Sequence, residues 1–317
     1  MPGIGVITNP KSRVNKRDPS KMRQLGYLLG SQGSPYATRS LDDLYRAAEE
    51  FKKAEIDILG INGGDGTIHV TLTAFAQVYG TTPLPKIAIL PGGTLNTIAA
   101  GIGLRGKPQD VLYEVIERYH QNEELRFVER NALKIVERNA LTVSDKYGFI
   151  FGNGLVANFL EAYYATGKPS PITGAKVLAR AVWGAIFRTA FTKRVFRRWE
   201  GQVTVDGEAW AQTDFATVTA ATVTEIGLGF KPFYRALEKP DHFALLGLHA
   251  SPLAICRELP RVHRGQPIRR DKGISQVARK VTLSSEEPFT YIIDGDTYSG
   301  ARELVLETGP RLKLLLP

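Results

Sequence analysis

The chain has 317 residues, of which 43% are hydrophobic and 23% are charged, and its formal net charge is +9. This composition is typical of a globular protein large enough for two domains, and it excludes an intrinsically disordered chain. The single cysteine, Cys256, excludes an internal disulfide, and no apolar run approaches the roughly 20 residues that span a bilayer. Since no signal peptide is visible either, we expect a cytoplasmic protein.

Residues 1–128 alternate buried-strand runs with amphipathic helices. "GIGVIT" predicts a first strand, and "IDILGI" and "KIAIL" predict two more. A helix is expected from Ser40 to Ala54, with Ser40 as its N-cap and an apolar face formed by Leu41, Leu44, Ala48 and Phe51. Another helix follows "IDILGI", with its apolar face at Ile68, Leu72, Phe75 and Tyr79. This order predicts an α/β domain with a parallel sheet.

A glycine-rich turn follows each of the last two strands. The first reads "GGDGT", from Gly63 to Thr67, and the second reads "PGGTLN", from Pro91 to Asn96. Both precede a helix, so free backbone N–H groups and the helix dipole would favour an anion there. Glycines also permit positive φ and close approach, by which successive amides can point at one phosphate. The pair of turns predicts a nucleotide polyphosphate site; the alternative is two tight turns that simply need glycine.

The sequence pattern changes after residue 128. Short β-like runs separated by turn residues predict an antiparallel β-sandwich over residues 129–317, whose last residues can return to the first domain. One long helix is expected from Gly174 to Arg198. The predicted fold class is therefore an α/β nucleotide-binding domain followed by a β-sandwich domain.

Basic residues concentrate in the second domain. Residues 1–128 hold 15 Lys and Arg against 13 Asp and Glu, whereas the remainder holds 26 against 19. Between Ala162 and Trp199 there are eight basic residues and no acidic one. A phosphate-rich partner, either lipid headgroups or nucleic acid, would fit this surface. A solvated helix face beside an anionic nucleotide would explain it equally well.

Several motifs together resemble the diacylglycerol kinase catalytic family, which includes bacterial lipid kinases and is related to sphingosine, ceramide and, more distantly, NAD kinases. They are "TNPKSR", "GGDGT", "ILPGGTLNTIA", a mid-chain "VDGE" and a late "DGD" before "YSGARELVLETGPRLKLLLP". The resemblance implies ATP- and Mg²⁺-dependent transfer of phosphate to the hydroxyl of a membrane lipid such as diacylglycerol, ceramide or a sphingoid base. It implies a peripheral enzyme that meets this lipid at an anionic membrane surface, the inner face of the membrane.

The resemblance also assigns roles to single residues. The ATP site would comprise Asn9, Ser12, Thr38, Gly63, Gly64, Asp65, Gly66, Thr67, Thr94 and Asn96. The catalytic acids would be Asp65, Asp294 and Asp296, with Asp296 as the general base. In an extended strand Asp294 and Asp296 would project from one face, where they could take a hydroxyl proton and hold Mg²⁺. The alternative is a simple Asp-Gly hairpin turn. A structural Mg²⁺ is expected near Asp241.

Three departures from the family pattern keep other functions open. His69 and Val70 follow "GGDGT" where the family has Asn-Glu, Thr97 replaces an aspartate, and Asp296 replaces a glutamate. These positions favour a catalytically inactive lipid- or nucleotide-binding module, while "GGDGT" alone would also suit a kinase of soluble NAD. Nucleic-acid binding is not expected, because the basic segment lacks interleaved aromatic residues. If the basic helix lies on a membrane, charge reversal at Arg194, Arg197 and Arg198 should remove recruitment without reducing stability.

Overall fold

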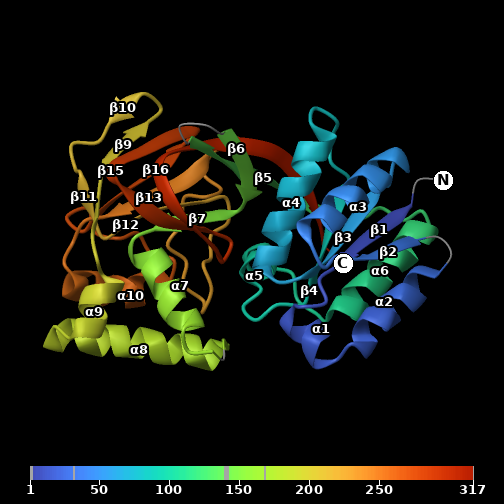
Figure 1. Cartoon of the computed structure of the whole chain (residues 1–317), viewed down its shortest axis with the longest axis horizontal. Coiled ribbons are helices and arrows are strands. Elements are labelled where there is room, and N and C mark those ends of the chain that lie inside the picture. Colours follow the sequence, from blue (N-terminus) through green and yellow to red (C-terminus); the bar gives the residue numbers. More distant parts are fainter. Residues whose placement is uncertain (1–2, 31–32, 139–142, 168, 317) are drawn as a thin grey trace. The chain divides into compact units, whose positions relative to one another are not determined.

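The computed structural model of the chain describes residues 3–30, 33–138, 143–167 and 169–316. The chain divides into two compact units. The first comprises Met1–Arg130 together with Arg311–Pro317, and the second comprises Asn131–Pro310. Figure 1 traces both units from the N-terminal blue to the C-terminal red. The predicted boundary after residue 128 falls inside β5 (Phe127–Arg138), a strand that runs from the first unit into the second.

The first unit contains a parallel sheet with the strand order β4-β3-β1-β2. Its strands are β1 (Ile4–Thr8), β2 (Gly33–Ala37), β3 (Ile58–Gly63) and β4 (Lys86–Pro91). The end of β16 (Asp296–Leu315) extends this sheet beyond β4, where Leu314 pairs in parallel with Ile87. Every residue of β1 and β3 is buried, as expected for the central strands of a sheet that helices cover on both faces.

Helices cover both faces of the parallel sheet, with α3 and α4 on one side and α2 and α6 on the other (Figure 1). The helices of this unit are α1 (Arg13–Arg17), α2 (Ser20–Leu29), α3 (Leu41–Lys53), α4 (Asp65–Tyr79), α5 (Thr97–Gly101) and α6 (Pro108–His120). Ser40 caps α3 in a capping box with Asp43, which confirms the predicted start. The prediction for Leu41 is wrong, because this residue is 60% exposed and Ala47 takes its place on the buried face.

The apolar face predicted for α4 is confirmed. Ile68, Leu72, Phe75 and Tyr79 are all buried, and the rings of Phe75 and Tyr79 stack at 5.8 Å. His69 in the first turn is also buried, so it does not face solvent as a histidine at a helix start often does. Packing on both sides therefore fixes the orientation of α4, whose N-terminus follows the "GGDGT" turn.

The second unit is built on antiparallel strands with the order β14-β13-β12-β7-β15-β16. β9 pairs with the start of β15, and β5 pairs with β16 and β6. Together with β5, the strands are β6 (Val143–Gly148), β7 (Ile150–Asn153), β8 (Trp199–Glu200), β9 (Gln202–Val205), β10 (Glu208–Ala209), β11 (Asp214–Phe215), β12 (Thr217–Ala221), β13 (Phe243–Leu248), β14 (Gly273–Ala278) and β15 (Lys280–Ile293). Side chains from nine of these strands and β16 form one buried core that includes Phe151, Phe243 and Tyr291. The predicted fold class is therefore confirmed.

Four helices gather on one side of these strands (Figure 1). They are α7 (Leu155–Tyr164), α8 (Pro171–Phe187), α9 (Ala190–Val195) and α10 (Pro252–His263). The single helix predicted from Gly174 to Arg198 is wrong. α8 ends at Arg188, which has a left-handed φ of 54°, and Thr189 then caps the separate helix α9. No helix in the described ranges is long and apolar enough to cross a membrane.

Candidate active site

The predicted nucleotide residues of the first unit gather where β1, β3 and β4 end. The backbone N–H of Asn9, just after β1, donates to the carbonyl of Asn62 at 3.0 Å. The N–H of Gly92, just after β4, donates to the carbonyl of Gly63 at 2.8 Å. Because the carboxyl ends of parallel strands meet at one edge of the sheet, three segments distant in sequence form one surface.

Asn9 fastens the loop after β1 to the helix after β3. Its Nδ2 donates to Thr67 Oγ1 at 2.9 Å, and its Oδ1 accepts the N–H of Lys11 at 2.8 Å. Its carbonyl accepts Asn15 Nδ2, also at 2.8 Å. All of these bonds are internal, so Asn9 shapes the site by holding the loop and the first turn of α4 together.

The glycines of the two turns allow the turns to touch each other. A Cβ on Gly93 would lie 2.4 Å from Gly64 Cα, and one on Gly63 would lie 2.3 Å from Thr67 Oγ1. The alternative of tight turns that need glycine for positive φ is excluded: none of Gly63, Gly64, Gly66, Gly92 and Gly93 adopts it, and the left-handed residue of the second turn is Asn96, at φ 49°. Because these residues have no side chain, the backbones of the two turns can approach each other, and a bound ligand, closely.

Asp65 links the two turns through its side chain. Its carboxylate accepts the backbone N–H of Thr97 at 3.0 Å and that of Ile98 at 3.1 Å, so it caps the N-terminus of α5. Burial raises the pKa of the Asp65 carboxyl, while the hydrogen bonds from these two amides oppose the rise. These contacts give Asp65 an architectural part in the site, because they connect the two glycine turns.

The N-terminus of α4 offers free donors toward the same edge. Its N-cap is Gly64, which has no side chain to cap the helix. The first N–H groups of a helix lack intrahelical partners, and the helix dipole adds partial positive charge there. The amides of Gly66 and Thr67 can therefore receive an anion of the size of a phosphate, whereas the amide of Asp65 bonds its own carboxylate.

Two buried polar atoms beside the turn after β4 have no hydrogen-bond partner within the described protein: Ser12 Oγ and Asn62 Oδ1. Both flank Gly92, whose hypothetical Cβ would lie 2.9 Å from Asn62 Oδ1 and 3.3 Å from Ser12 Oγ. Buried polar atoms are usually paired, so an orphaned pair next to a glycine turn fits a polar ligand such as a nucleotide. The residues of this site therefore fit ATP as a ligand.

Sequence reasoning missed Asn62. A signal was present, because asparagine is a polar residue within "ILGING", a strand that is buried along its whole length. Its Nδ2 donates to Asn15 Oδ1 at 3.4 Å, which leaves its Oδ1 for another partner. Thr38 follows β2 and Thr94 lies in the turn after β4, and the N–H of Thr38 donates to the carbonyl of Thr8 at 3.0 Å.

Asp294 lies in the second unit, in a turn rather than in the extended strand that was predicted. Asp294 and Gly295 have φ of 48° and 102° and connect β15 to β16, which is the Asp-Gly hairpin alternative. The Asp294 carboxylate is buried and accepts the N–H of Phe149 at 2.9 Å and that of Ile150 at 2.8 Å. The predicted pairing of Asp294 and Asp296 on one strand face is therefore wrong, since Asp294 is committed to the backbone ahead of β7.

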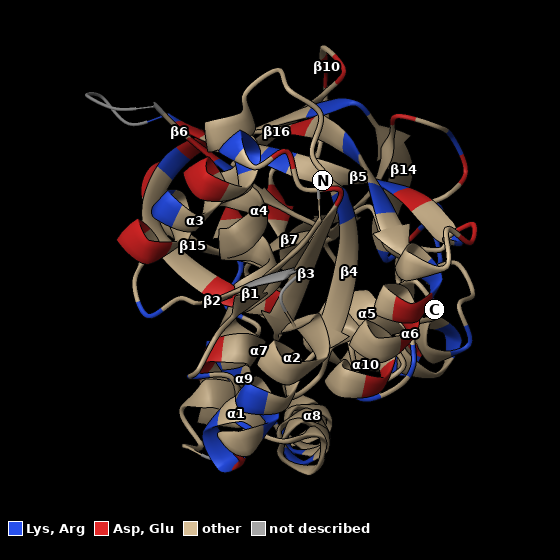
Figure 2. Cartoon of the chain, turned by 90° about the vertical axis from the view of Figure 1, so that its right-hand side faces the viewer, with Lys and Arg blue, Asp and Glu red and all other residues tan. Residues whose placement is uncertain are grey.

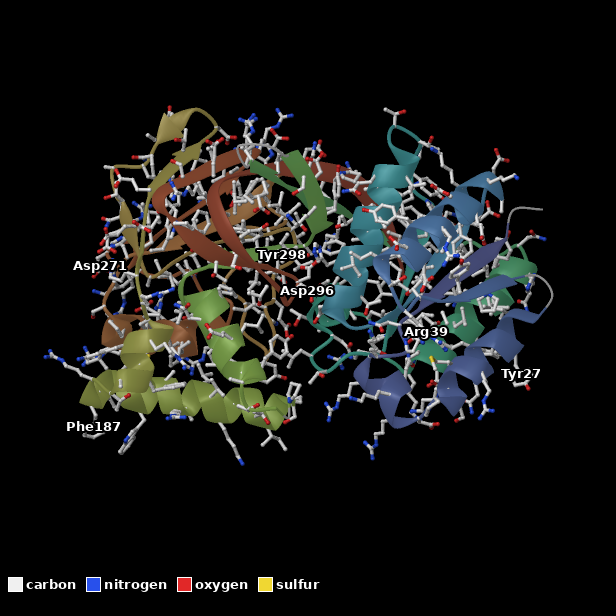
Figure 3. The ribbon with its side chains drawn as sticks, in the orientation of Figure 1. Tyr27, Arg39, Phe187, Asp271, Asp296 and Tyr298 are labelled. Carbon is white, nitrogen blue, oxygen red and sulfur yellow. The ribbon has the colours of Figure 1, made fainter. Side chains whose placement is uncertain are left out.

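Asp296 is the first residue of β16, opposite Ile293 across the hairpin, and it remains partly exposed. Burial raises the pKa of its carboxyl above the ordinary value. Tyr298 lies nearby (Figure 3), and burial together with the charge of Asp296 raises the pKa of Tyr298 to about 12. A carboxylate with a raised pKa is a stronger base, which suits proton transfer from a hydroxyl.

A partly buried polar cluster supports the strands next to Asp296. Lys146 Nζ lies 2.7 Å from Glu137 Oε2, and Tyr291 OH donates to the same oxygen at 2.7 Å. Lys146 also lies 4.8 Å from the centre of the Tyr298 ring, which stacks on Tyr291. Sequence reasoning missed this cluster, because its members come from β5, β6, β15 and β16 and no local pattern joins them.

The residues around Asp241 do not fit a metal site built by the protein. The Asp241 carboxylate accepts Asn131 Nδ2 at 3.3 Å, and its carbonyl accepts Thr308 Oγ1 at 2.9 Å. Across the described ranges of the chain, no three His, Cys, Asp or Glu side chains gather as a metal would require. Asp241, at φ 54°, shapes a turn with the start of β5, and the structure gives no support for the expected Mg²⁺ there.

Comparison with known proteins connects the first unit to one family. Residues 3–126 match the diacylglycerol kinase catalytic domain. A diacylglycerol kinase of Bacillus subtilis (strain 168) is 30% identical over 101 residues, which cover 31% of this chain and 32% of that protein. The match thus spans about a third of the curated relative's length. The resemblance predicted from the sequence is confirmed.

Two solved structures share the fold over nearly the whole chain. A diacylglycerol kinase from Bacillus anthracis str. Sterne aligns with 99% of this chain and 97% of its own, at a TM-score of 0.64 and 13% identity. Yeast NADH kinase complexed with NADH aligns with 100% of this chain and 84% of its own, at a TM-score of 0.54 and 11% identity. At such identities the likeness extends to the fold alone.

Proposed function

We propose, because residues 3–126 match the diacylglycerol kinase catalytic domain, that this protein transfers the γ-phosphate of ATP to the hydroxyl of a membrane lipid. The observation that carries the proposal is the polar surface at the ends of β1, β3 and β4. There the uncapped N-terminus of α4 lies beside the orphaned Ser12 Oγ and Asn62 Oδ1. A nucleotide polyphosphate is the ligand whose charge and oxygens such a surface suits best.

In this proposal the amides of Gly66 and Thr67 bind phosphate oxygens, and Ser12 with Asn62 binds a polar group of the nucleotide. Asp65 keeps the two turns in contact through the α5 amides. Mg²⁺ would arrive with ATP and neutralise phosphate charge, since it commonly keeps several waters and takes few protein ligands. No residue of the chain is assigned to it.

Asp296 is the proposed general base. Its raised pKa and partial exposure suit a group that takes a proton from an acceptor hydroxyl. Most of the rate enhancement in phosphoryl transfer comes from positioning and electrostatics, so the base is expected to contribute about 10² to 10⁴ of it. Asp294 is proposed to position the hairpin that presents Asp296, since its own carboxylate holds the β7 backbone.

The proposed acceptor is a lipid with a hydroxyl near the headgroup, such as diacylglycerol, ceramide or a sphingoid base. The test is to incubate the protein with labelled ATP, Mg²⁺ and a total lipid extract, and then to identify the labelled product. A labelled lipid that disappears with Asp296→Asn is expected. Absence of any labelled lipid, with ATP still bound, would favour an inactive nucleotide-binding module.

A kinase of soluble dinucleotides is the second candidate, because the fold is shared with yeast NADH kinase. The same reaction run with NAD or NADH in place of lipid separates the two functions. Transfer of label to the dinucleotide without lipid or detergent would overturn the lipid kinase proposal.

A further inference from the structure

Helix α8 has an exposed apolar face. Its large side chains there are Ile172, Trp183, Ile186 and Phe187, which are 70%, 66%, 54% and 59% exposed. Figure 3 shows Phe187 projecting outward at the end of the helix. Positions 172, 179, 183 and 186 follow a helical repeat, so Ala179 continues the stripe between Ile172 and Trp183. Such a run of large apolar side chains is unusual on a surface that meets only water.

The opposite face of α8 already has its partners. Val177, Ala181 and Ala185 are buried, and Gly184 approaches α9 so closely that a Cβ would lie 2.1 Å from Thr192 Oγ1. Packing of the helix within its own unit therefore does not account for Ile172, Trp183, Ile186 and Phe187. The outer stripe is a second apolar face on the same helix.

Basic residues surround this stripe without any acidic counterpart. They are Lys176, Arg180, Arg188, Lys193, Arg194 and Arg197, and no Asp or Glu occurs between Ala162 and Trp199. In Figure 2, α8 carries blue and no red. Two copies of such a face would bring like charges together, which disfavours self-association through it. The charge complements an anionic partner.

Arg198 differs from these residues. It pairs with Asp214, and its guanidinium donates to the carbonyls of Asp214 at 2.8 Å and His249 at 2.9 Å. These contacts lead us to expect that reversing the charge of Arg198 lowers stability, contrary to the prediction from the sequence. Arg194 and Arg197 are exposed, so they remain suitable for that test.

A cavity beside the stripe points to an apolar component in the partner. It has a volume of about 550 Å³, and α8 contributes Ala175, Leu178, Ala179, Val182, Trp183 and Ile186 to it. Leu228, Phe230 and Leu259 form much of the other wall, so its surface is almost entirely apolar. An apolar cavity of this kind would not bind a polar nucleic acid, whereas it would bind a hydrocarbon group.

We propose that the outer face of α8 docks onto an anionic lipid bilayer. Trp183, Ile186 and Phe187 insert at the level of the headgroups, and the surrounding Lys and Arg side chains bind lipid phosphates. The inference deepens the proposed function by naming the surface at which a lipid acceptor is met. It can be tested without ATP, so its failure and the failure of the kinase proposal are distinguishable.

The test uses the full chain with vesicles of phosphatidylcholine containing about 30% phosphatidylglycerol, roughly one anionic lipid in three. Co-sedimentation at low salt is expected, and it should weaken steeply as salt rises. Trp183 fluorescence should shift to shorter wavelength on binding, because Trp199 is buried and Trp210 packs on the core. The shift should be lost in Trp183→Phe while sedimentation persists.

Two double variants carry equal charge changes. Arg194→Glu with Arg197→Glu should weaken binding about 25-fold or more, since each basic residue near a bilayer contributes roughly a factor of five. Lys239→Glu with Arg302→Glu makes the same change in net charge at exposed positions elsewhere. Its vesicle affinity should differ from that of the wild type only by the effect of the net charge, to within about twofold. Trp183→Ala with Phe187→Ala should weaken it about tenfold or more, from the apolar area lost.

Three outcomes would overturn the proposal: no vesicle binding at low salt, equal weakening by both charge variants, or tighter binding of a short DNA than of the vesicles. Unchanged thermal unfolding of each variant excludes loss of fold as the cause. A protein that binds vesicles through α8 yet phosphorylates no lipid in detergent micelles would contradict the kinase proposal alone.

Discussion

The carboxylate of Asp65 accepts the backbone N–H of Thr97 at 3.0 Å, and this bond ties the turn after β3 to the helix after β4. A second bond from Ile98 completes the cap. The acid within "GGDGT" thus binds another loop of its own unit. These two bonds fix the distance between the two glycine turns.

Replacing Asp65 by alanine should lower both stability and ATP affinity. The loss leaves two amides at the start of α5 without an acceptor, which costs about 1–3 kcal/mol per buried unpaired group. Asp65→Asn retains one acceptor and should lose less. Denaturant unfolding and calorimetric ATP titration measure the two effects. Asp42→Ala, at an exposed first-turn position of α3, is the control and should cost about 0.3–1 kcal/mol or less.

Gly93→Ala should disrupt the contact between the turns, because the new Cβ would meet Gly64 Cα at 2.4 Å. We expect ATP affinity to fall at least tenfold, about 1.4 kcal/mol, with lower stability. Gly26→Ala makes the same chemical change inside α2, where nothing lies within 4 Å of the added atom. That control should stabilise the protein by about 0.5–1 kcal/mol. Equal ATP affinity in both variants would contradict the proposed site.

Asp296→Asn should lower turnover by about 100-fold or more with little change in ATP affinity, if Asp296 is the base. Because burial raises its pKa, wild-type turnover should fall as pH drops through that raised value, and the variant should lose this limb of the profile. The folded pKa lies above the unfolded one, so the carboxyl favours folding most at low pH, and this contribution is lost as pH rises through the folded pKa. The variant should therefore be more stable than wild type at neutral pH.

Asp294→Asn should behave in the opposite way. The buried carboxylate holds the amides of Phe149 and Ile150, so its loss should reduce the free energy of unfolding by about 1–3 kcal/mol. Turnover per folded molecule should fall less than in Asp296→Asn. Kinetics at a temperature where both variants are fully folded make the comparison. A larger loss of turnover in the stable, folded Asp294 variant would transfer the role of base to that residue.

Arg198→Ala should destabilise the second unit by about 2 kcal/mol or more, since it removes an ion pair and the guanidinium donor of the His249 carbonyl, whereas the Asp214 carbonyl keeps a bond from Gln212 Nε2. Arg197→Ala, one residue earlier and exposed, should stay within about 0.5 kcal/mol of wild type. Thermal unfolding distinguishes them. Similar unfolding temperatures would mean that the Arg198 contacts contribute little.

Local patterns predicted much of the fold. The Ser40 cap and the buried face of α4 depend on neighbours in the same helix, so periodicity and capping chemistry were sufficient. The break after Phe187 escaped prediction because a single left-handed arginine, with no glycine or proline, ends α8. Asn62, the Asp294 bonds and the Lys146 cluster depend on contacts between distant segments, which one sequence does not reveal. For the same reason, the close approach of Gly64 and Gly93 could not be distinguished from a need for positive φ.

The chain enters the second unit through β5 and leaves it through β16, and residues 311–317 complete the first unit. On the ribosome, the segment that pairs Leu314 with Ile87 emerges about 180 residues after Arg130. Until then β4 is an unpaired edge of a parallel sheet, a surface prone to wrong pairing. The order of synthesis therefore requires the second unit, with its apolar α8 face, to be made before the surface at the ends of β1, β3 and β4 can reach its final stability.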